Sequence, residues 1–125
     1  MRNAVLLALA GLGLLTTVGC PQAPSGQQPN RLVVAVIPKS TGAEFWETVE
    51  EGARAAAAEL DVQMKWEGPL TETEIAEQNK IIENMVNLGV DGIALAPLNP
   101  KAQRKPVENA VAAGIPGVIF DSDLD

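Results

Sequence analysis

From residue 31 onward, the pattern of apolar and polar positions alternates between two periods. Strands are predicted over residues 31–38, 62–66, 91–98 and 115–121, and the first of them is a continuous apolar run typical of a strand buried on both faces of a sheet. Between them, apolar residues recur every three or four positions and predict helices over residues 45–60, 71–89 and 101–113. Strands that alternate with helices predict an α/β fold with a doubly wound parallel sheet and right-handed crossovers.

The three predicted helices differ in how clearly their limits are marked. The first is expected to bury one apolar face, made of Phe45, Val49, Ala53, Ala56 and Leu60. The second is expected to start at Thr71, which has Glu74 three positions on as in a capping box, and to end at Gly89. Residues 71–78 are interpreted as a charged, solvated face. In the third, either Pro106 is the first helical residue or the turn before it is loose.

The composition of the 125-residue chain narrows the classes of function. A net charge of −7 with scattered basic residues argues against a nucleic-acid partner. The chain has no histidine and a single cysteine, which excludes His-based general-base chemistry and His or Cys metal clusters. We therefore expect a binding protein and not an enzyme, with no cofactor and no metal.

Residues 1–20 have the features of an export signal. Arg2 precedes an apolar run that is too short to span a bilayer, and small residues lead to Cys20. The segment resembles a bacterial lipobox, although Thr17 stands where leucine is usual, and this resemblance implies a lipid anchor on Cys20. Ordinary secretion with an incidental thiol is the alternative. Residues 21–31 are rich in Pro, Gln, Ser and Gly and are expected to form a flexible linker.

Several strings, taken in order, carry a family resemblance: VIPKSTGAEFWETVEEGARAAAAEL, QNKIIENMVNLGVDGIALAPLNP and AAGIPGVIFDSD. Over residues 32–123 they resemble the type I periplasmic solute-binding proteins, in the branch that binds ribose, rhamnose and autoinducer-2. The resemblance implies the substrate-binding component of an ABC importer, located in the periplasm or cell envelope. Its partners would be the permease and ATPase subunits and a small polar solute, namely a sugar, deoxysugar, polyol or autoinducer-2-like molecule.

The same resemblance implies an incomplete molecule. Members of the family hold one ligand between two lobes, and residues 32–125 would supply a truncated N-terminal lobe without the C-terminal one. Two alternatives remain open. One is a sensor module that presents the ligand to a membrane receptor, and the other is a flavodoxin-like secreted domain, for which Pro-Lys-Ser-Thr-Gly at 38–42 is a weak phosphate loop.

The predicted ligand site lies where the strands end, because ligands of open α/β sheets bind outside the carboxyl ends of the strands. The loops at this edge are 38–43, 96–100 and 121–123. Their polar candidates for binding hydroxyl groups are Lys39, Ser40, Thr41, Asp121 and Asp123. For Lys39 the alternative is a solvated loop lysine, whereas a carboxylate at the end of a buried strand, Asp121, needs a partner.

An aromatic pair, Phe45 and Trp46, opens the first predicted helix. Sugars have apolar C–H faces and a polar rim, so their sites combine flat rings with groups that bind hydroxyls. The resemblance implies that this pair helps to wall the site, and we expect one ring to face the ligand and the other the core. The alternative is that the pair only anchors the helix.

Two departures count against ribose itself as the ligand. Ribose binders carry asparagine just before the aromatic pair, where this chain has Gly42-Ala43. They also carry arginine after the aspartate of the fourth strand, where this chain has Ser122. Pro38-Lys39 after the first strand and Asp121-Ser122-Asp123 after the fourth look more like the autoinducer-2 and rhamnose branch.

Overall fold

A computed structural model describes residues 31–125. The export signal over 1–20, the lipidation site Cys20 and residues 21–30 of the linker lie outside the described residues, and their predictions stay predictions. The centre of the fold is a parallel sheet in the order β2-β1-β3-β4. Its strands are β1 (Val33–Ile37), β2 (Gln63–Trp66), β3 (Gly92–Leu95) and β4 (Gly117–Ile119). The predicted parallel α/β sheet is confirmed, although each strand is shorter than its apolar run.

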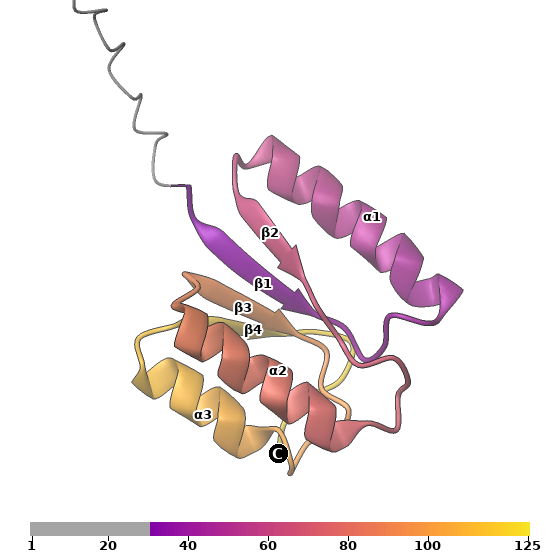
Figure 1. Cartoon of the computed structure of the whole chain (residues 1–125), viewed down its shortest axis with the longest axis vertical. Helices are drawn as coiled ribbons and strands as arrows, with labels where there is room; N and C mark the ends of the chain where they lie inside the picture. Colours follow the sequence, from indigo (N-terminus) through magenta and orange to yellow (C-terminus); the bar gives the residue numbers. More distant parts are fainter. Residues whose placement is uncertain (1–30) are drawn as a thin grey trace, which may run out of the picture.

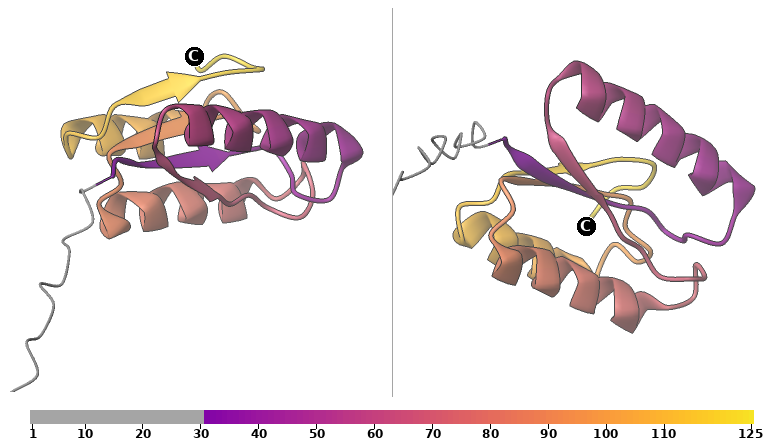
Figure 2. Two further views of the ribbon diagram at one scale, coloured as in Figure 1. Left: turned by 90° about the horizontal axis from the view of Figure 1, so that it is seen from above. Right: turned by 45° about the horizontal axis from the view of Figure 1, so that its top comes forward.

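Helices cover both faces of this sheet. They are α1 (Glu44–Glu59), α2 (Ile75–Leu88) and α3 (Arg104–Ala112). Helix α1 lies on one face, whereas α2 and α3 lie side by side on the other, which the two turned views make plain (Figure 1, Figure 2). No helix within residues 31–125 is long and apolar enough to cross a membrane.

Two predicted helix starts are wrong by several residues. The backbone N–H of Thr71 donates to Glu74 Oε2 at 2.8 Å, so the capping contact exists, but it closes a turn ahead of α2. Residues 101–103 likewise form turns, and Pro106 is the third residue of α3. Its missing N–H costs nothing there, because the first four N–H groups of a helix lack intrahelical partners. The predicted end of α2 at Gly89 is confirmed by its left-handed φ of 68°.

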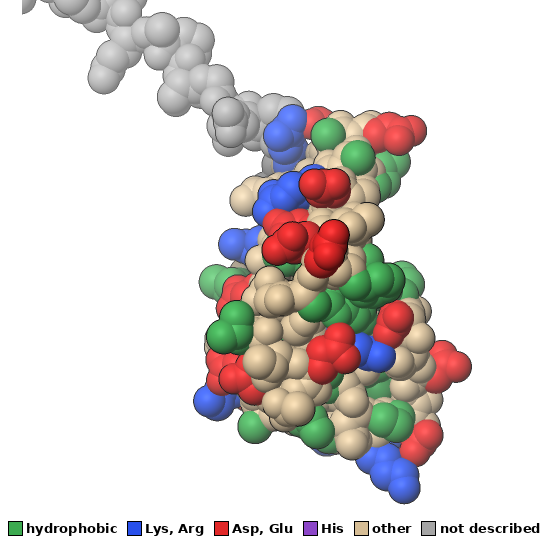
Figure 3. All heavy atoms as spheres, turned by 90° about the vertical axis from the view of Figure 1, so that its right-hand side faces the viewer, with side chains coloured by type: hydrophobic (Ala, Val, Ile, Leu, Met, Phe, Trp, Pro, Cys, Tyr) green, Lys and Arg blue, Asp and Glu red, His purple; other side chains and the backbone are tan. Residues whose placement is uncertain are grey.

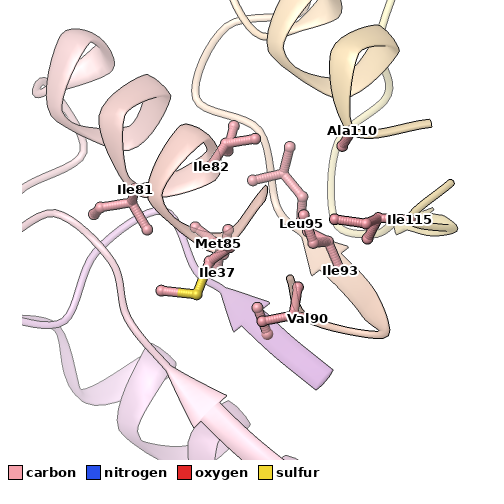
Figure 4. Close-up of a cluster of buried hydrophobic side chains, with 10 residues drawn as sticks. Ile37, Ile81, Ile82, Met85, Val90, Ile93, Leu95, Ala110 and Ile115 are labelled. Atoms are coloured by element: carbon pink, nitrogen blue, oxygen red, sulfur yellow. The ribbon is translucent and has the colours of Figure 1, made fainter. Parts of the chain in front are cut away.

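The hydrophobic core lies between the sheet and the α2–α3 layer. Figure 4 shows Ile81, Ile82 and Met85 of α2 pointing toward side chains of β1 and β3. The complete cluster of buried side chains is Ala35, Ile37, Ile81, Ile82, Met85, Val90, Ile93, Leu95, Ala110 and Ile115. This packing holds α2 against the sheet and so fixes where the residues at the start of α2 lie.

The α1 side of the sheet is packed more sparsely. Of the face predicted for α1, Phe45 and Leu60 are exposed, and the residue of α1 that is buried is Trp46. The predicted face is therefore wrong at Phe45, whose buried place Trp46 takes, whereas Ala53, Ala56 and Leu60 do line a groove against β1 and β2 as predicted. On the edge strand β4, Val118 is also exposed.

Candidate functional site

The strand order changes direction between β1 and β3. The next strand in the chain, β2, lies on one side of β1, and β3 lies on the other. At such a switch point the loops that follow the two strands diverge and leave a crevice at the carboxyl edge of the sheet. Figure 3 views this edge and shows hydrophobic side chains gathered beside a basic group that acidic groups flank. Residues from three loops contribute to this surface.

The polar centre of the edge joins the first and last of these loops. The ammonium group of Lys39 lies 2.6 Å from Asp121 Oδ2 and donates to Ser122 Oγ, also at 2.6 Å. The side chains of Lys39 and Asp121 are 19% and 33% exposed, so the pair is partly desolvated but still open to solvent. Lys39 was expected to be either a ligand contact or a solvated loop lysine. The structure adds a third arrangement, in which its ammonium group is paired within the protein.

The backbone at Asp121 is what directs its carboxylate toward Lys39. Asp121 has a φ of 65°, and the N–H of Ser122 donates to the carbonyl of Phe120 at 2.7 Å, which closes a three-residue turn. Aspartate tolerates this left-handed region better than most residues. The turn follows β4 directly, where Phe120 N–H still bonds to Leu95 O.

The aromatic pair is split between the core and the surface. Trp46 is 2% exposed, whereas Phe45 is 61% exposed. Their ring centroids are 5.0 Å apart and nearly perpendicular, and Trp46 makes a second edge contact with Phe120 at 6.3 Å. The indole N–H of Trp46 donates to Glu72 Oε1 at 2.8 Å. Trp46 thus fixes the start of α1, and Phe45 is left with a free ring face.

The remaining predicted residues lie apart from the Lys39–Asp121 pair. Ser40 is buried, with 2% of its surface exposed. Thr41 is exposed, but both its backbone N–H and its hydroxyl donate to Pro69 O, at 2.8 and 3.3 Å. Asp123 is exposed near the end of the chain. The two hydrogen bonds from Thr41 to Pro69 O tie the loop after β1 to the loop after β2.

Glycine makes that tie between the two loops possible. A Cβ added to Gly42 would lie 2.8 Å from the carbonyl oxygen of Leu70, and one added to Gly68 would lie 2.7 Å from Pro38 Cγ. Both positions lack room for a side chain because the loops pack backbone against backbone. Gly42 is therefore a packing requirement of this loop.

The edge can bind a ligand that has several hydroxyl groups. An ammonium group has three N–H donors, and two of those of Lys39 point at Asp121 and Ser122, which leaves one. The carboxylate of Asp121 keeps lone pairs that can accept from ligand hydroxyls, and charge-assisted bonds of this kind are strong. The exposed ring of Phe45 offers a flat apolar surface nearby.

Four further residues contribute to this edge but were not predicted as site residues from the sequence: Glu72, Gln78, Phe120 and Ser122. The interpretation of residues 71–78 as a solvated face is confirmed for most of them, which are exposed, but it is wrong for Gln78, which is completely buried, and it missed that Glu72 accepts from Trp46. A signal for Gln78 was present in the sequence. It lies three residues after Ile75 and four before Ile82, which places a polar residue on the apolar face of α2.

Comparison with known proteins agrees with the fold and with the resemblance seen in the sequence. Residues 34–125 match the family model described as periplasmic binding protein domain, and the chain belongs to this family. A D-ribose/D-allose-binding protein of Pseudomonas aeruginosa is 34% identical over 101 residues, which are 79% of this chain and 32% of that protein.

Two solved structures show the same lobe. A carbohydrate transporter solute-binding protein from Agrobacterium radiobacter, in complex with D-arabinose, aligns with a TM-score of 0.75 at 32% identity, over 78% of this chain and 33% of that one. An ABC transporter solute-binding protein from Agrobacterium vitis with bound D-fucose aligns with a TM-score of 0.72 at 41% identity, over 74% and 32%. The chain spans about a third of the length of the relatives that it matches.

Proposed function

We propose that the chain supplies the first lobe of the substrate-binding component of an ABC importer for an uncharged sugar or sugar-like solute. The observation that carries this proposal is the Lys39–Asp121–Ser122 cluster beside the exposed ring of Phe45, at the switch point of the sheet. The ligands named for the relatives, which are ribose, allose, arabinose and fucose, support the same chemical class. On this proposal the protein binds its solute without changing it chemically and needs no cofactor.

The charge balance of the site favours an uncharged ligand. The cation of Lys39 is already neutralised by Asp121 at 2.6 Å, and Asp123 and Glu72 add negative charge to the same edge. A phosphorylated or carboxylated sugar would meet this negative charge, and the ammonium group of Lys39 is already paired. Hydroxyl groups, in contrast, can both donate to Asp121 and accept from Lys39.

Each candidate residue has a distinct role in this proposal. Lys39 and Asp121 bind hydroxyl groups directly, and Phe45 stacks on an apolar face of the ligand. Thr41 and Asp123, which are exposed at the rim, reach the ligand when a second lobe closes over it. Ser40 and Trp46 are buried and support the loop and the ring that make the contacts.

A second lobe is part of the proposal, because small-molecule sites usually bury about 70–90% or more of the ligand and a single sheet edge leaves one side of it in water. The permease and ATPase subunits would receive the ligand from the closed protein. The export signal over 1–20 would direct the chain across the membrane, and a lipid on Cys20 with the linker 21–31 would then hold the lobe at the periplasmic or cell-envelope membrane surface.

The test is an NMR titration of the full chain with arabinose, fucose, allose, ribose, rhamnose and autoinducer-2, together with ribose 5-phosphate and galacturonate. We expect dissociation constants weaker than about 1 mM, with chemical-shift changes confined to the amides of Lys39, Phe45 and Asp121, for uncharged ligands only. Asp121→Asn should abolish the changes. Glu59→Gln, the same charge change at the far end of α1, should leave them intact.

Two outcomes of this titration would contradict the proposal. Shifts with the phosphorylated sugar but not with uncharged ones would overturn the ligand class. Micromolar binding of any sugar by the monomeric chain would show that one lobe suffices, and it would remove the need for a second one.

A further inference from the structure

Each of the two strands that flank the switch point has a proline within two residues after its end, Pro38 after β1 and Pro97 after β3. The last ladder bond between them runs from the N–H of Ala96 to Ile37 O at 2.9 Å. Pro38 and Pro97 directly follow these two residues, and neither has a backbone N–H. The carbonyls of Pro38 and Ala96 lie beyond the last paired residues, at the point where the strands separate, and both residues are buried, so both carbonyls need hydrogen-bond partners.

One side chain from α2 satisfies both of these carbonyls. The amide nitrogen Nε2 of Gln78 donates to Pro38 O and to Ala96 O, each at 2.9 Å. Its Oε1 accepts the backbone N–H of Leu98 at 3.0 Å. Gln78 is 0% exposed, and both of its N–H donors are used. Through these bonds, Gln78 of α2 connects the loop after β1 to the loop after β3.

Two further amides continue the same network toward α3. Gln103, also 0% exposed, accepts the N–H of Asn99 at 2.5 Å and donates to Asn79 Oδ1 at 3.0 Å. Asn79, the neighbour of Gln78 on α2, donates in turn to Ala102 O at 3.4 Å. The loop 96–100 is thus held at two points, by Gln78 near its start and by Gln103 near its end.

We propose that Gln78 is a positioning residue of the site, which sets the separation between loop 38–43 and loop 96–100. Lys39 directly follows Pro38, the residue that Gln78 binds, so any movement of this carbonyl moves the ammonium group. That the two loops face a sugar rests on the proposed function. That Gln78 holds them together rests only on the hydrogen bonds within residues 31–125.

A role in packing alone would not need an amide at this position. Methionine has a similar length and suits an apolar helix face, but it offers no donor to the two carbonyls and no acceptor to Leu98. Water would then compete for three buried backbone groups, and the strand ends would be free to separate. The consequence predicted for Gln78→Met is local loosening of the loops beyond any general loss of stability.

Hydrogen exchange at single backbone amides of the full chain tests this prediction by NMR. In Gln78→Met, we expect the amides of Ala96 and Asn99 to exchange at least about tenfold faster than global unfolding explains, the effect of losing one buried hydrogen bond. Neither amide bonds to Gln78 itself, so the effect would have to pass through the loop. Ile82→Ala, which removes a fully buried side chain one turn further along α2, is the matched control and should accelerate exchange only through global unfolding.

A measurement on the unmodified chain covers the case in which Gln78→Met does not fold. Both Nε2 protons of Gln78 should exchange more than about tenfold slower than those of the exposed Gln63. Equal rates for the two side chains would overturn the proposal, as would wild-type protection of Ala96 and Asn99 in a folded Gln78→Met variant. A chain that binds no sugar would instead count against the proposed function, and these exchange rates would decide the role of Gln78 regardless.

Discussion

The two adjacent aromatic residues at the start of α1 should differ sharply in what their removal costs. Trp46 is 2% exposed, and deleting a buried Trp or Phe side chain to alanine typically costs about 3–5 kcal/mol. Its hydrogen bond to Glu72 is lost at the same time. Phe45 is 61% exposed, so about two-fifths of the about 1.5–3 kcal/mol for a fully buried side chain applies, which is about 1 kcal/mol. We therefore expect Trp46→Ala to lose at least about 2 kcal/mol more than Phe45→Ala.

Urea unfolding of the full chain, followed by far-UV circular dichroism, measures this difference. The midpoint should fall far more in Trp46→Ala than in Phe45→Ala, with an unchanged dependence of the unfolding free energy on urea. In thermal unfolding, a loss of 3 kcal/mol corresponds to a drop of about 12 °C or more for a domain of this size. Trp46→Phe keeps a buried ring but removes the indole N–H, so its urea midpoint should lie between those of Trp46→Ala and Phe45→Ala.

The sugar titration supplies the other half of the comparison. Phe45→Ala should weaken or remove the ligand-induced shifts while the chain stays folded, because its ring offers the free apolar surface. Equal stability losses in the two alanine variants would refute this division of the pair, and so would a larger loss for Phe45. Unchanged sugar shifts in Phe45→Ala would remove the ring from the site and leave its exposure without a function.

Three further outcomes follow from single features of the chain. Gly52→Ala, where an added Cβ meets nothing within 4 Å, should raise the unfolding free energy by about 0.5–1 kcal/mol, whereas Gly42→Ala, with a backbone oxygen at 2.8 Å, should lower it; a Gly42→Ala variant at least as stable as the wild type in urea unfolding would contradict the loop packing. Asp121→Asn should change stability by no more than about 1 kcal/mol, because its pair with Lys39 is partly exposed and asparagine keeps the left-handed turn; a larger loss would make the pair structural. Mass spectrometry of the membrane fraction should find the mature N-terminus at a lipid-modified Cys20, and an unmodified thiol there would refute the anchor.

The sequence by itself determined the class of fold and the edge of the sheet at which the candidate site is predicted. Apolar runs separated by helical periods predict a parallel sheet, since each signal is local and depends only on side chains a few positions apart. Parallel strands end at one edge of the sheet, so the sequence alone predicts that the loops carrying Lys39 and Asp121 lie at the same edge. The left-handed end of α2 at Gly89 follows from local chemistry in the same way.

The tertiary structure decided how these groups are paired and which way they face. The contact between Lys39 and Asp121 depends on the order β2-β1-β3-β4, which brings together two loops separated by 82 residues, and no local signal encodes that order. The burial of Trp46 and the exposure of Phe45 depend on the rotation of α1 about its axis, which packing against β2 helps to set. Gln78 became visible as a link between strands only once Pro38 and Ala96 were placed on either side of it, because a hydrogen bond between distant segments is a property of their arrangement in space.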